Sequence, residues 1–406
     1  MAEIPRFIQI HYLTTYPASL LNRDDAGFAK RLPFGAAVRT RISSQCLKRH
    51  WRTFDGQGAL SSIRGPETMS VRSRYIFEQI ARPLYEKYNQ EHVNRTVKAV
   101  SDVVLGAAEK EAGESRQKSG SELRTNQLIV LGRAEIEYLT RLVDELLERA
   151  ADAKVDKNGV KDRLGKEGLK NLAAIGRGAG LDAALFGRMK TSDVLADCDA
   201  AVHVAHAFTV HQEQSETDYF TAVDDLVRSL DEEAGAGAAH VNAAELTSGI
   251  YYGYVSVDVR LLISNLEGVP PEAWQKADIS IAGEVLENLV YLVATVSPGA
   301  KRGSTAPYSY ADFVATEAGS TQPCTWANAF FDPVRIAEGM REKAIHALSR
   351  HVERLDSVYK PGNKRRYVSL YDAGLLETSA KREVDIKALA GWVNRRVVEG
   401  IEEEVQ

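Results

Sequence analysis

Cysteine is scarce in this chain, and its three cysteines lie far apart. Cys46, Cys198 and Cys324 form no CxxC pair, so the sequence offers neither a disulfide framework nor a zinc knuckle. No apolar run approaches the roughly 18–20 residues that span a bilayer. The first residues also lack the basic and apolar regions of a secretory signal. These absences predict a reduced, cytoplasmic protein that does not enter a membrane.

The common motifs of nucleotide binding and nucleophilic catalysis are missing as well. No Walker A sequence occurs, and the glycines at 176, 178 and 180 fail the GxGxxG pattern because residue 181 is leucine. Residue spacing alone nominates no Ser–His–Asp or Cys–His arrangement. We therefore predict no cofactor, no metal site and no catalytic residue, and we do not expect an enzyme.

The size and overall charge of the chain limit the kind of partner it can have. Its 406 residues are enough for two or three domains, and 44% hydrophobic with 26% charged residues is ordinary for a globular protein. The formal net charge is −5. A polyanionic partner must therefore be bound by a localised groove, with the remaining surface acidic.

One segment reverses this balance. Between Arg23 and Arg52 there are eight basic residues against Asp24 and Asp25, a local excess of six positive charges over thirty positions. The basic residues are Arg23, Lys30, Arg31, Arg39, Arg41, Lys48, Arg49 and Arg52. Such an excess is the electrostatic signature of a polyanion site. Residue types alone do not distinguish a nucleic acid from a nucleotide or an acidic protein, and a capped surface helix with solvated charges is the simpler alternative.

The pattern inside this segment predicts a strand followed by a helix. Residues 37–42, AVRTRI, alternate with period two, so Arg39 and Arg41 should share one outward face. Ser43 or Ser44 is a preferred N-cap, and the next residues contain no glycine or proline. The unpaired amides of a first helical turn suit phosphate. Lys48 and Arg52 would share one face of that helix, with Arg49 beside them.

The remaining pattern predicts an α+β protein whose β core is divided in the sequence. Strand character occurs at residues 6–14, 202–210 and 250–263, and strand-like pieces continue to about residue 331. Between them, residues 71–153 are mostly helical in period, with a clear apolar stripe from Ile136 to Ala150. Further helices are predicted at 281–296, 333–356 and 385–404. We interpret the central helices as one inserted domain.

Two other groups of residues could carry chemistry. His203, His206 and His211 suggest a metal, but a strand would spread His203 and His211 roughly 26 Å apart. Asp24 and Asp25 could serve a two-metal nuclease, although aspartate is also common in turns. We favour the structural interpretation for both groups.

Aromatic residues in a polar context give a third group of candidates. Tyr219, Phe220 and Thr221 lie in EQSETDYFTAVDD, which we interpret as a loop. Exposed aromatics there could wedge between bases. The alternative is that both rings anchor the loop to the core.

Several blocks of the sequence together resemble one family, the CasC-like backbone subunit of Cascade, the type I-E CRISPR surveillance complex. They occur in consistent order between about residue 4 and residue 331. The blocks are LNRDD (21–25), RISSQCLKRHWR (41–52), GRMKTS (187–192), AHAFTVHQ (205–212), YFTAVDDL (219–226), LTSGIYYGY (246–254) and PGAK (298–301).

The resemblance implies a fold and a function. It implies an RNA-recognition-motif-like (ferredoxin-like) palm, an inserted α-helical fingers domain and a protruding thumb. The implied boundaries are palm 1–60, fingers 61–200, strand and thumb 201–249, palm 250–340 and C-terminal helices 341–406. Several copies would assemble head to tail on a CRISPR guide RNA with other Cascade subunits, and each thumb would kink the guide. The guide would remain free to pair with target DNA in antiviral defence.

The resemblance also implies which residues contact RNA. Lys30, Ser43, Gln45, Lys48 and Arg52 would hold the sugar-phosphate backbone, and Met189 and the Phe220 region would hold the kink. The full set that we predict to contact RNA is Lys30, Arg39, Arg41, Ser43, Ser44, Gln45, Lys48, Arg49, Arg52, Met189, Tyr219, Phe220, Thr221, Lys301 and Arg302.

The chain departs from the family pattern in some places. Cys46 stands where small polar residues are common, residues 231–240 are acidic and rich in alanine and glycine, and the part beyond about 335 matches poorly. The aromatic RNP1 signature is absent. The rival hypothesis is a metal-dependent RNA-cleaving backbone subunit like those of type III complexes, using Asp24 or Asp25. A lone single-strand-binding protein is a third possibility.

Overall fold

The structure is a computed structural model of the chain. It describes residues 3–65, 68–106, 122–150, 155–175, 180–188, 197–222 and 240–400. Two compact units are present. Unit 1 comprises Met1–Phe54, Val204–Ser256 and Leu286–Gln406, and unit 2 comprises Asp55–His203 and Val257–Val285. Residues 257–285, which we expected in the palm, thus belong to unit 2.

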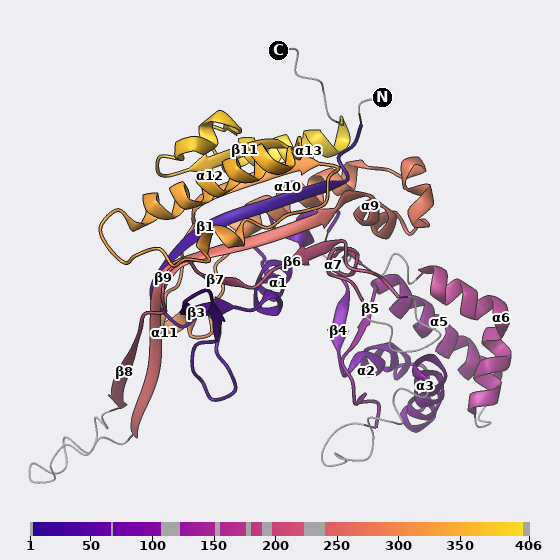
Figure 1. The fold of residues 1–406 in the computed structure, drawn as a ribbon. Helices are drawn as coiled ribbons and strands as arrows, with labels where there is room; N and C mark the ends of the chain where they lie inside the picture. The colour runs from indigo at the N-terminus through magenta and orange to yellow at the C-terminus, as the bar shows by residue number, and fades with distance from the viewer. Residues whose placement is uncertain are drawn as a thin grey trace, which may run out of the picture. The chain divides into compact units, whose positions relative to one another are not determined.

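Unit 1 is built on a large sheet (Figure 1). Its strands follow the order β12-β11-β10-β1-β9-β7-β3-β2, and β8 pairs with β9 off this path. The strands are β1 (Phe7–Ser19), β2 (Arg31–Phe34), β3 (Ala37–Ile42), β7 (Ala207–Thr209), β8 (Ser215–Ala222), β9 (His240–Asp258), β10 (Ala311–Gly319), β11 (Lys364–Ser369) and β12 (Lys381–Arg382). The helices are α1 (Ser44–Thr53), α10 (Ser280–Thr295), α11 (Arg302–Thr305), η6 (Ala327–Phe330), α12 (Met340–Tyr359), η7 (Gly374–Thr378) and α13 (Ile386–Val398).

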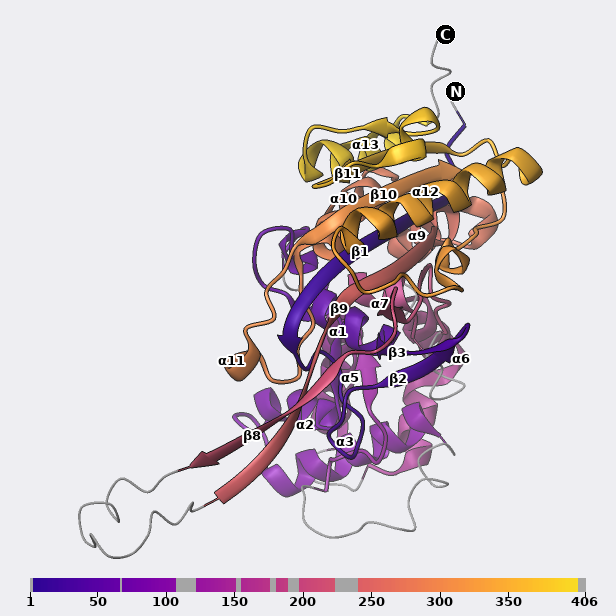
Figure 2. The same cartoon turned by 60° about the vertical axis from the view of Figure 1, so that its left-hand side comes forward.

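Helices cover both faces of this sheet. Tyr12 and Tyr16 of β1 line one small cavity together with Leu47 and Trp51 of α1 and Val293 of α10. Alternate residues of a strand point to opposite faces. On the other face, Leu13 of β1 shares a core cluster with residues of β10, η6 and α12, and Figure 2 shows α12 lying along the sheet.

The C-terminal region therefore completes the sheet. We expected only helices beyond residue 341, and that expectation was wrong, because β11 pairs antiparallel with β10 and β12 pairs parallel with β11. β11 (KRRYVS) and β12 (KR) are short and strongly basic, so they carry little of the apolar alternation that indicates a strand.

Strand β8 and the first part of β9 form a long hairpin. Its register is antiparallel from Ser215 opposite Thr247 to Ala222 opposite His240. The hairpin projects beyond the rest of unit 1 in both views (Figures 1 and 2). The aromatic residues that we expected on a loop thus lie on a strand.

The predicted strand at 250–263 is wrong for its last residues. β9 ends at Asp258, whose side chain accepts a hydrogen bond from the Leu261 N–H at 3.1 Å. This cap starts α9 (Val259–Glu267), and a side-chain cap of this kind stabilises a helix start. The β-branched residues that follow are therefore helical.

Unit 2 is mostly helical. Its elements are η1 (Leu60–Ser62), β4 (Val71–Ser73), α2 (Ile76–Ala81), η3 (Arg82–Leu84), α3 (Gln90–Leu105), β5 (Ile129–Leu131), α5 (Arg133–Ala150), α6 (Lys157–Ile175), α7 (Leu181–Phe186), β6 (Val202–Val204), α9 and η5 (Pro271–Lys276). The predicted apolar stripe of α5, including Leu139, Val143 and Leu147, packs in the core with Val93 and Val97 of α3. None of the described helices has the length and hydropathy that crossing a membrane requires.

Candidate nucleic-acid interface

The corner between β3 and α1 forms as the sequence predicts. Ser43 is the N-cap of α1, and its Oγ accepts a hydrogen bond from the Cys46 N–H at 3.3 Å. The Ser43 N–H donates to Asn22 Oδ1 at 2.9 Å, which fixes the cap against the preceding loop. Ser43 is buried, whereas Ser44 is half-buried.

The first turn of α1 offers fewer open amides than expected. The Cys46 N–H bonds to the cap, and the Ser44 N–H donates to His206 Nδ1 at 3.0 Å. Of the first-turn amides in the described chain, that of Gln45 remains without a hydrogen bond. The backbone of this turn therefore offers few donors to an anion, and side chains would have to supply most of them.

Cationic side chains from three separate segments meet around this corner. Burial raises the pKa of the Cys46 thiol, and the positive charges of Lys30, Arg49 and Arg302 oppose that rise. Burial likewise lowers the pKa of His206, and Arg41 and Lys30 lower it further. A charge shifts the pKa of another group in this way only when the two groups are near each other. Lys30, Arg49 and Arg302 thus lie near Cys46, and Lys30 and Arg41 lie near His206, whose Nδ1 accepts the Ser44 N–H. We call these four cations at the start of α1 the basic corner.

Helix α1 carries the remaining candidates of this segment. Leu47 and Trp51 are buried and hold the helix on the sheet, while Gln45 and Arg49 are exposed on its other side. The remaining pair, Lys48 and Arg52, is half-buried. Their spacing of four residues places them on one face of the helix, as predicted.

Arg39 does not belong to this interface, so the expectation that it points outward with Arg41 was wrong. Its side chain is fully buried, and its guanidinium donates to the carbonyls of Thr209 at 2.9 Å and Phe330 at 2.8 Å. The strand does alternate, but η6 covers its face at this position. Val38, the neighbouring residue of the strand, is 45% exposed.

The aromatic candidates lie on the hairpin. Tyr219 is 73% exposed and Phe220 is 44% exposed, so neither serves as a core anchor. Lys301 Nζ lies 5.5 Å from the centre of the Phe220 ring, within the range of a cation–π contact. Lys301 precedes Arg302, so this contact joins the hairpin to the basic corner. Thr221 pairs through its backbone with Val241, and Met189 lies outside the described residues.

An ion-pair cluster that the sequence did not reveal supports Lys30. Arg31 donates to Glu213 Oε1 at 2.5 Å and also to Glu245. Glu245 is almost buried, and it accepts a hydrogen bond from the Ala29 N–H at 2.6 Å. Residues 29 and 31 are thus both tied to the base of the hairpin. More than 200 positions separate Arg31 from Glu245, so no local spacing could indicate this pair.

Three of the residues considered for metal chemistry, Asp24, His206 and His211, have structural partners. Asp24 Oδ1 accepts a hydrogen bond from the Phe28 N–H at 2.9 Å and so closes a turn. His211 is buried, and its Nδ1 lies 2.7 Å from the carbonyl oxygen of Gln212. His206 accepts the Ser44 N–H. Within the described part of the chain, no group of three or more histidine, cysteine or acidic residues could hold a metal ion.

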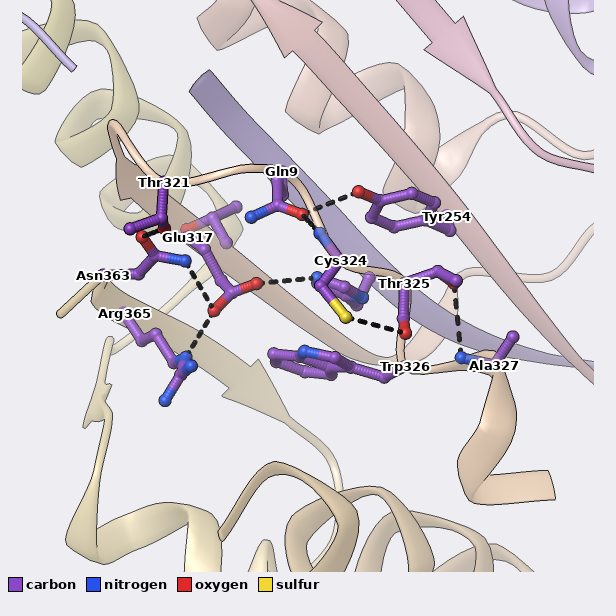
Figure 3. Close-up of polar contacts among 12 residues, drawn as sticks. Gln9, Tyr254, Glu317, Thr321, Cys324, Thr325, Trp326, Ala327, Asn363 and Arg365 are labelled. Carbon is purple, nitrogen blue, oxygen red and sulfur yellow. Dashed lines mark hydrogen bonds and ion pairs between the residues drawn. The ribbon is translucent and has the colours of Figure 1, made fainter. Parts of the chain in front are cut away.

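The other face of the sheet holds a buried polar network (Figure 3). His11 stacks on Trp326 with ring centres 3.6 Å apart, and its Nε2 lies 3.2 Å from Glu317. Glu317 in turn accepts a hydrogen bond from Arg365 at 2.6 Å. Burial lowers the pKa of His11, and Glu317 opposes this effect. α12 and η6 cover this network, so His11 and Glu317 are buried rather than exposed to a ligand.

Comparisons with known proteins agree with this architecture. The family model described as CT1975-like protein matches residues 8–394. A chain of a solved "CRISPR RNA-guided surveillance complex, pre-nicking" superposes with a TM-score of 0.77 at 27% identity, covering 96% of this chain and 100% of its own. A chain of a second "CRISPR RNA-guided surveillance complex" gives 0.70 at 24% identity, covering 96% and 99%.

No curated protein matches the chain. The family model nevertheless spans nearly all of it, and the two solved chains are each covered almost completely. The resemblance to the backbone subunits of Cascade is confirmed, and the chain belongs to the CT1975-like protein family.

Proposed function

We propose that this protein is a non-catalytic subunit that holds a CRISPR guide RNA by its sugar-phosphate backbone. The observation that carries the proposal is the meeting of Lys30, Arg41, Arg49 and Arg302 at the basic corner. Cations supply the electrostatic attraction to phosphate that dominates nucleic-acid affinity. The exposed Gln45 can add hydrogen bonds to the ribose or the phosphate.

Such a site would bind any RNA sequence. Phosphate and sugar contacts position a strand but carry no sequence information, which resides in the base edges. Leaving those edges free lets a guide pair with a target strand. We therefore propose that target DNA is bound through the guide.

The strand order supports an RNA-recognition-motif-like palm. The central order β10-β1-β9-β7, with α1 before β7 and α10 between β9 and β10, follows the βαββαβ arrangement of ferredoxin-like folds. RNP1 aromatic residues would have no exposed position here, because α12 and η6 cover the sheet face opposite α1 and α10. In this proposal unit 2 is the fingers and the β8–β9 hairpin is the thumb.

We also propose that several copies assemble head to tail along one guide, together with other subunits. The exposed aromatic residues of the hairpin support this, because they can reach a strand or a neighbouring copy. The solved chains that resemble this one come from multi-subunit complexes. The free thiols of Cys46, Cys198 and Cys324 fit a cytoplasmic location.

Sedimentation of the purified protein with guide-length RNA tests this proposal. We expect a complex with several protomers per RNA molecule, whereas the lone-binder alternative predicts one protomer per site without contact between copies. A constant protomer number as the RNA is lengthened would contradict the assembly.

Incubation of the same complex with Mg²⁺ tests the enzyme alternative. We expect intact RNA with both the native protein and the Asp25→Ala variant. Specific cuts that disappear in the variant would support the type III-like nuclease instead.

A further inference from the structure

A large cavity lies at the edge of the sheet opposite the basic corner. Its volume is about 770 Å³, and residues of β11, β12, η7 and α13 line it. We call it the C-terminal basic pocket. Glu377 is the one acidic residue of this lining, against six basic ones. The basic residues are Lys364, Arg365, Arg366, Lys381, Arg382 and Arg396.

The inner arginines of the pocket are held in place by the fold. Arg366 and Arg396 are 9% and 7% exposed, and their guanidinium carbons lie 5.8 Å and 5.5 Å from the centre of the Trp392 ring. Arg366 also lies 3.6 Å from Glu383. Charged groups are unfavourable to bury unless other charges or hydrogen bonds compensate them. Arg365 is paired with Glu317 at 2.6 Å and with Asp356 at 2.8 Å, so its charge is compensated within the fold. The contacts of Arg366 and Arg396 hold their guanidinium groups at the pocket in a fixed arrangement.

The outer cations are open to solvent. Lys364, Lys381 and Arg382 are exposed, and Lys381 lies opposite Arg366 in the parallel pairing of β12 with β11. Arg382 donates to the Ser369 carbonyl at 2.9 Å. Across the described residues, Lys364 and Lys381 form no ion pair. The rim of the pocket therefore adds uncompensated charge to the fixed charge inside.

We propose that the C-terminal basic pocket binds phosphodiester groups of a nucleic-acid strand, as a second site apart from the basic corner. Five strand spacings separate β11 from β3 in the sheet order, which is about 24 Å. This distance is too long for both sites to hold one phosphate group. The proposal goes beyond guide binding at the basic corner and does not depend on it.

The lining favours phosphate over a folded acidic protein. Guanidinium groups match phosphate oxygens geometrically, and Asn363, Thr378 and Ser379 add neutral hydrogen-bonding groups. Protein interfaces are usually centred on exposed aromatic or apolar anchors. The one aromatic residue of this lining, Tyr367, is only 1% exposed.

Charge reversal at the rim tests the proposal. The probe is a fluorescent single-stranded DNA of about thirty nucleotides, added to the protein already saturated with guide RNA that is not complementary to it. Lys364→Glu with Lys381→Glu should weaken DNA binding at least tenfold. The salt dependence should fall by about 1.4 in slope, at about 0.7 for each lost phosphate contact on a single strand.

A matched control separates the pocket from general electrostatics. Lys343 and Lys387 are also exposed lysines of unit 1 outside this pocket, and Lys343→Glu with Lys387→Glu changes the net charge equally. This control should keep the DNA affinity within twofold, and both double variants should unfold at the temperature of the native protein. Lys364→Arg with Lys381→Arg should bind DNA like the native protein.

Two further measurements show which nucleic acid the pocket prefers and separate this site from the basic corner. An RNA of the same sequence as the DNA probe shows whether the pocket prefers one sugar. The variant Arg49→Ala with Arg302→Ala, tested without guide, should retain the DNA binding that depends on Lys364 and Lys381. The proposal is overturned by absent DNA binding, by equal losses in pocket and control variants, or by unchanged DNA affinity of the pocket variant. In the last case, loss of a partner subunit from the complex would identify an acidic protein as the occupant.

Discussion

Two arginines only ten positions apart illustrate how differently one residue type is used in this protein. Arg39 is buried and donates to two backbone carbonyls, whereas Arg49 is exposed beside Cys46 and Arg302. The first stabilises the junction of β3, β7 and η6, and the second is available to a ligand. Local sequence patterns gave both the same expected function, because burial of Arg39 depends on a segment almost 300 residues away.

This contrast gives a direct prediction. Arg39→Ala leaves the carbonyls of Thr209 and Phe330 without their donors and should lower the free energy of unfolding by roughly 2–4 kcal/mol. Arg49→Ala should change it by less than about 0.5 kcal/mol but should weaken RNA binding. Urea unfolding and RNA titration of both variants measure this. Normal stability of Arg39→Ala together with weak RNA binding would contradict the assignment.

His211 should make the stability of unit 1 depend on pH. Burial lowers its pKa, and the nearby Arg39 lowers it further, while the hydrogen bond to Gln212 opposes both. The unfolded chain therefore binds a proton more readily than the folded one, so stability is full above about pH 6.5 and falls below it. Protonation would also break the hydrogen bond that Nε2 accepts from the Ile250 N–H at 3.2 Å.

The variant His211→Gln isolates this effect. Between pH 7 and pH 5 the native protein should lose up to about 2 kcal/mol more stability than the variant. Chemical unfolding at a series of pH values measures the difference, and other titrating groups such as His11 cancel in the comparison. Parallel pH profiles for the two proteins would show that His211 is not buried in its neutral form.

At the scale of elements, the ring of Tyr12 in β1 lies directly against Gly253 of the neighbouring strand β9. A Cβ added to Gly253 of β9 would lie 2.1 Å from the ring carbon Cζ of Tyr12. Gly253→Ala should therefore destabilise the protein by roughly 1–3 kcal/mol or more, since overpacking forces side chains and backbone to shift. Gly303→Ala, with no atom within 4 Å of the new Cβ, is the matched control. Thermal unfolding of the pair should show a loss only for Gly253→Ala.

The hairpin of β8 and β9 should affect the shape of bound RNA more than its affinity. Phe220 is exposed and contacts Lys301, so Phe220→Ala should leave stability unchanged. If the ring wedges between bases, chemical probing of the bound guide should lose its regular pattern of reactive bases, while the affinity falls by about tenfold, which is near the lower end of the effect of one lost stacking contact. An unchanged probing pattern would count against a thumb function for this hairpin.

The elements that could be predicted from the sequence are those fixed by local chemistry. The N-cap Ser43, the strand of residues 37–42 and the apolar stripe of α5 all follow from short-range patterns. The change from strand to helix at Asp258 was missed because β-branched residues continue through it. The strands β11 and β12 were missed because they are short and depend on tertiary pairing: β11 pairs with β10, and β12 pairs in turn with β11.

At the scale of the whole molecule, a locally basic surface lies on an acidic protein. The net charge of −5 disfavours nonspecific binding of nucleic acid over the general surface. The basic corner brings together cations from three segments of the chain. The sequence blocks indicated which residues these are, but not how they are arranged in space. Its support through Arg31, Glu213 and Glu245 could not be predicted, because only the folded hairpin brings these residues together.

The salt dependence of guide binding tests the central claim most directly. Two RNAs of guide length and unrelated sequence are titrated with the native protein and with Arg49→Ala plus Arg302→Ala at several salt concentrations. The slope of log affinity against log salt should fall by about 1.4 in the double variant, at about 0.7 per phosphate contact, and equally for both RNAs. An unchanged slope, or a loss confined to one RNA sequence, would contradict a phosphate-binding basic corner.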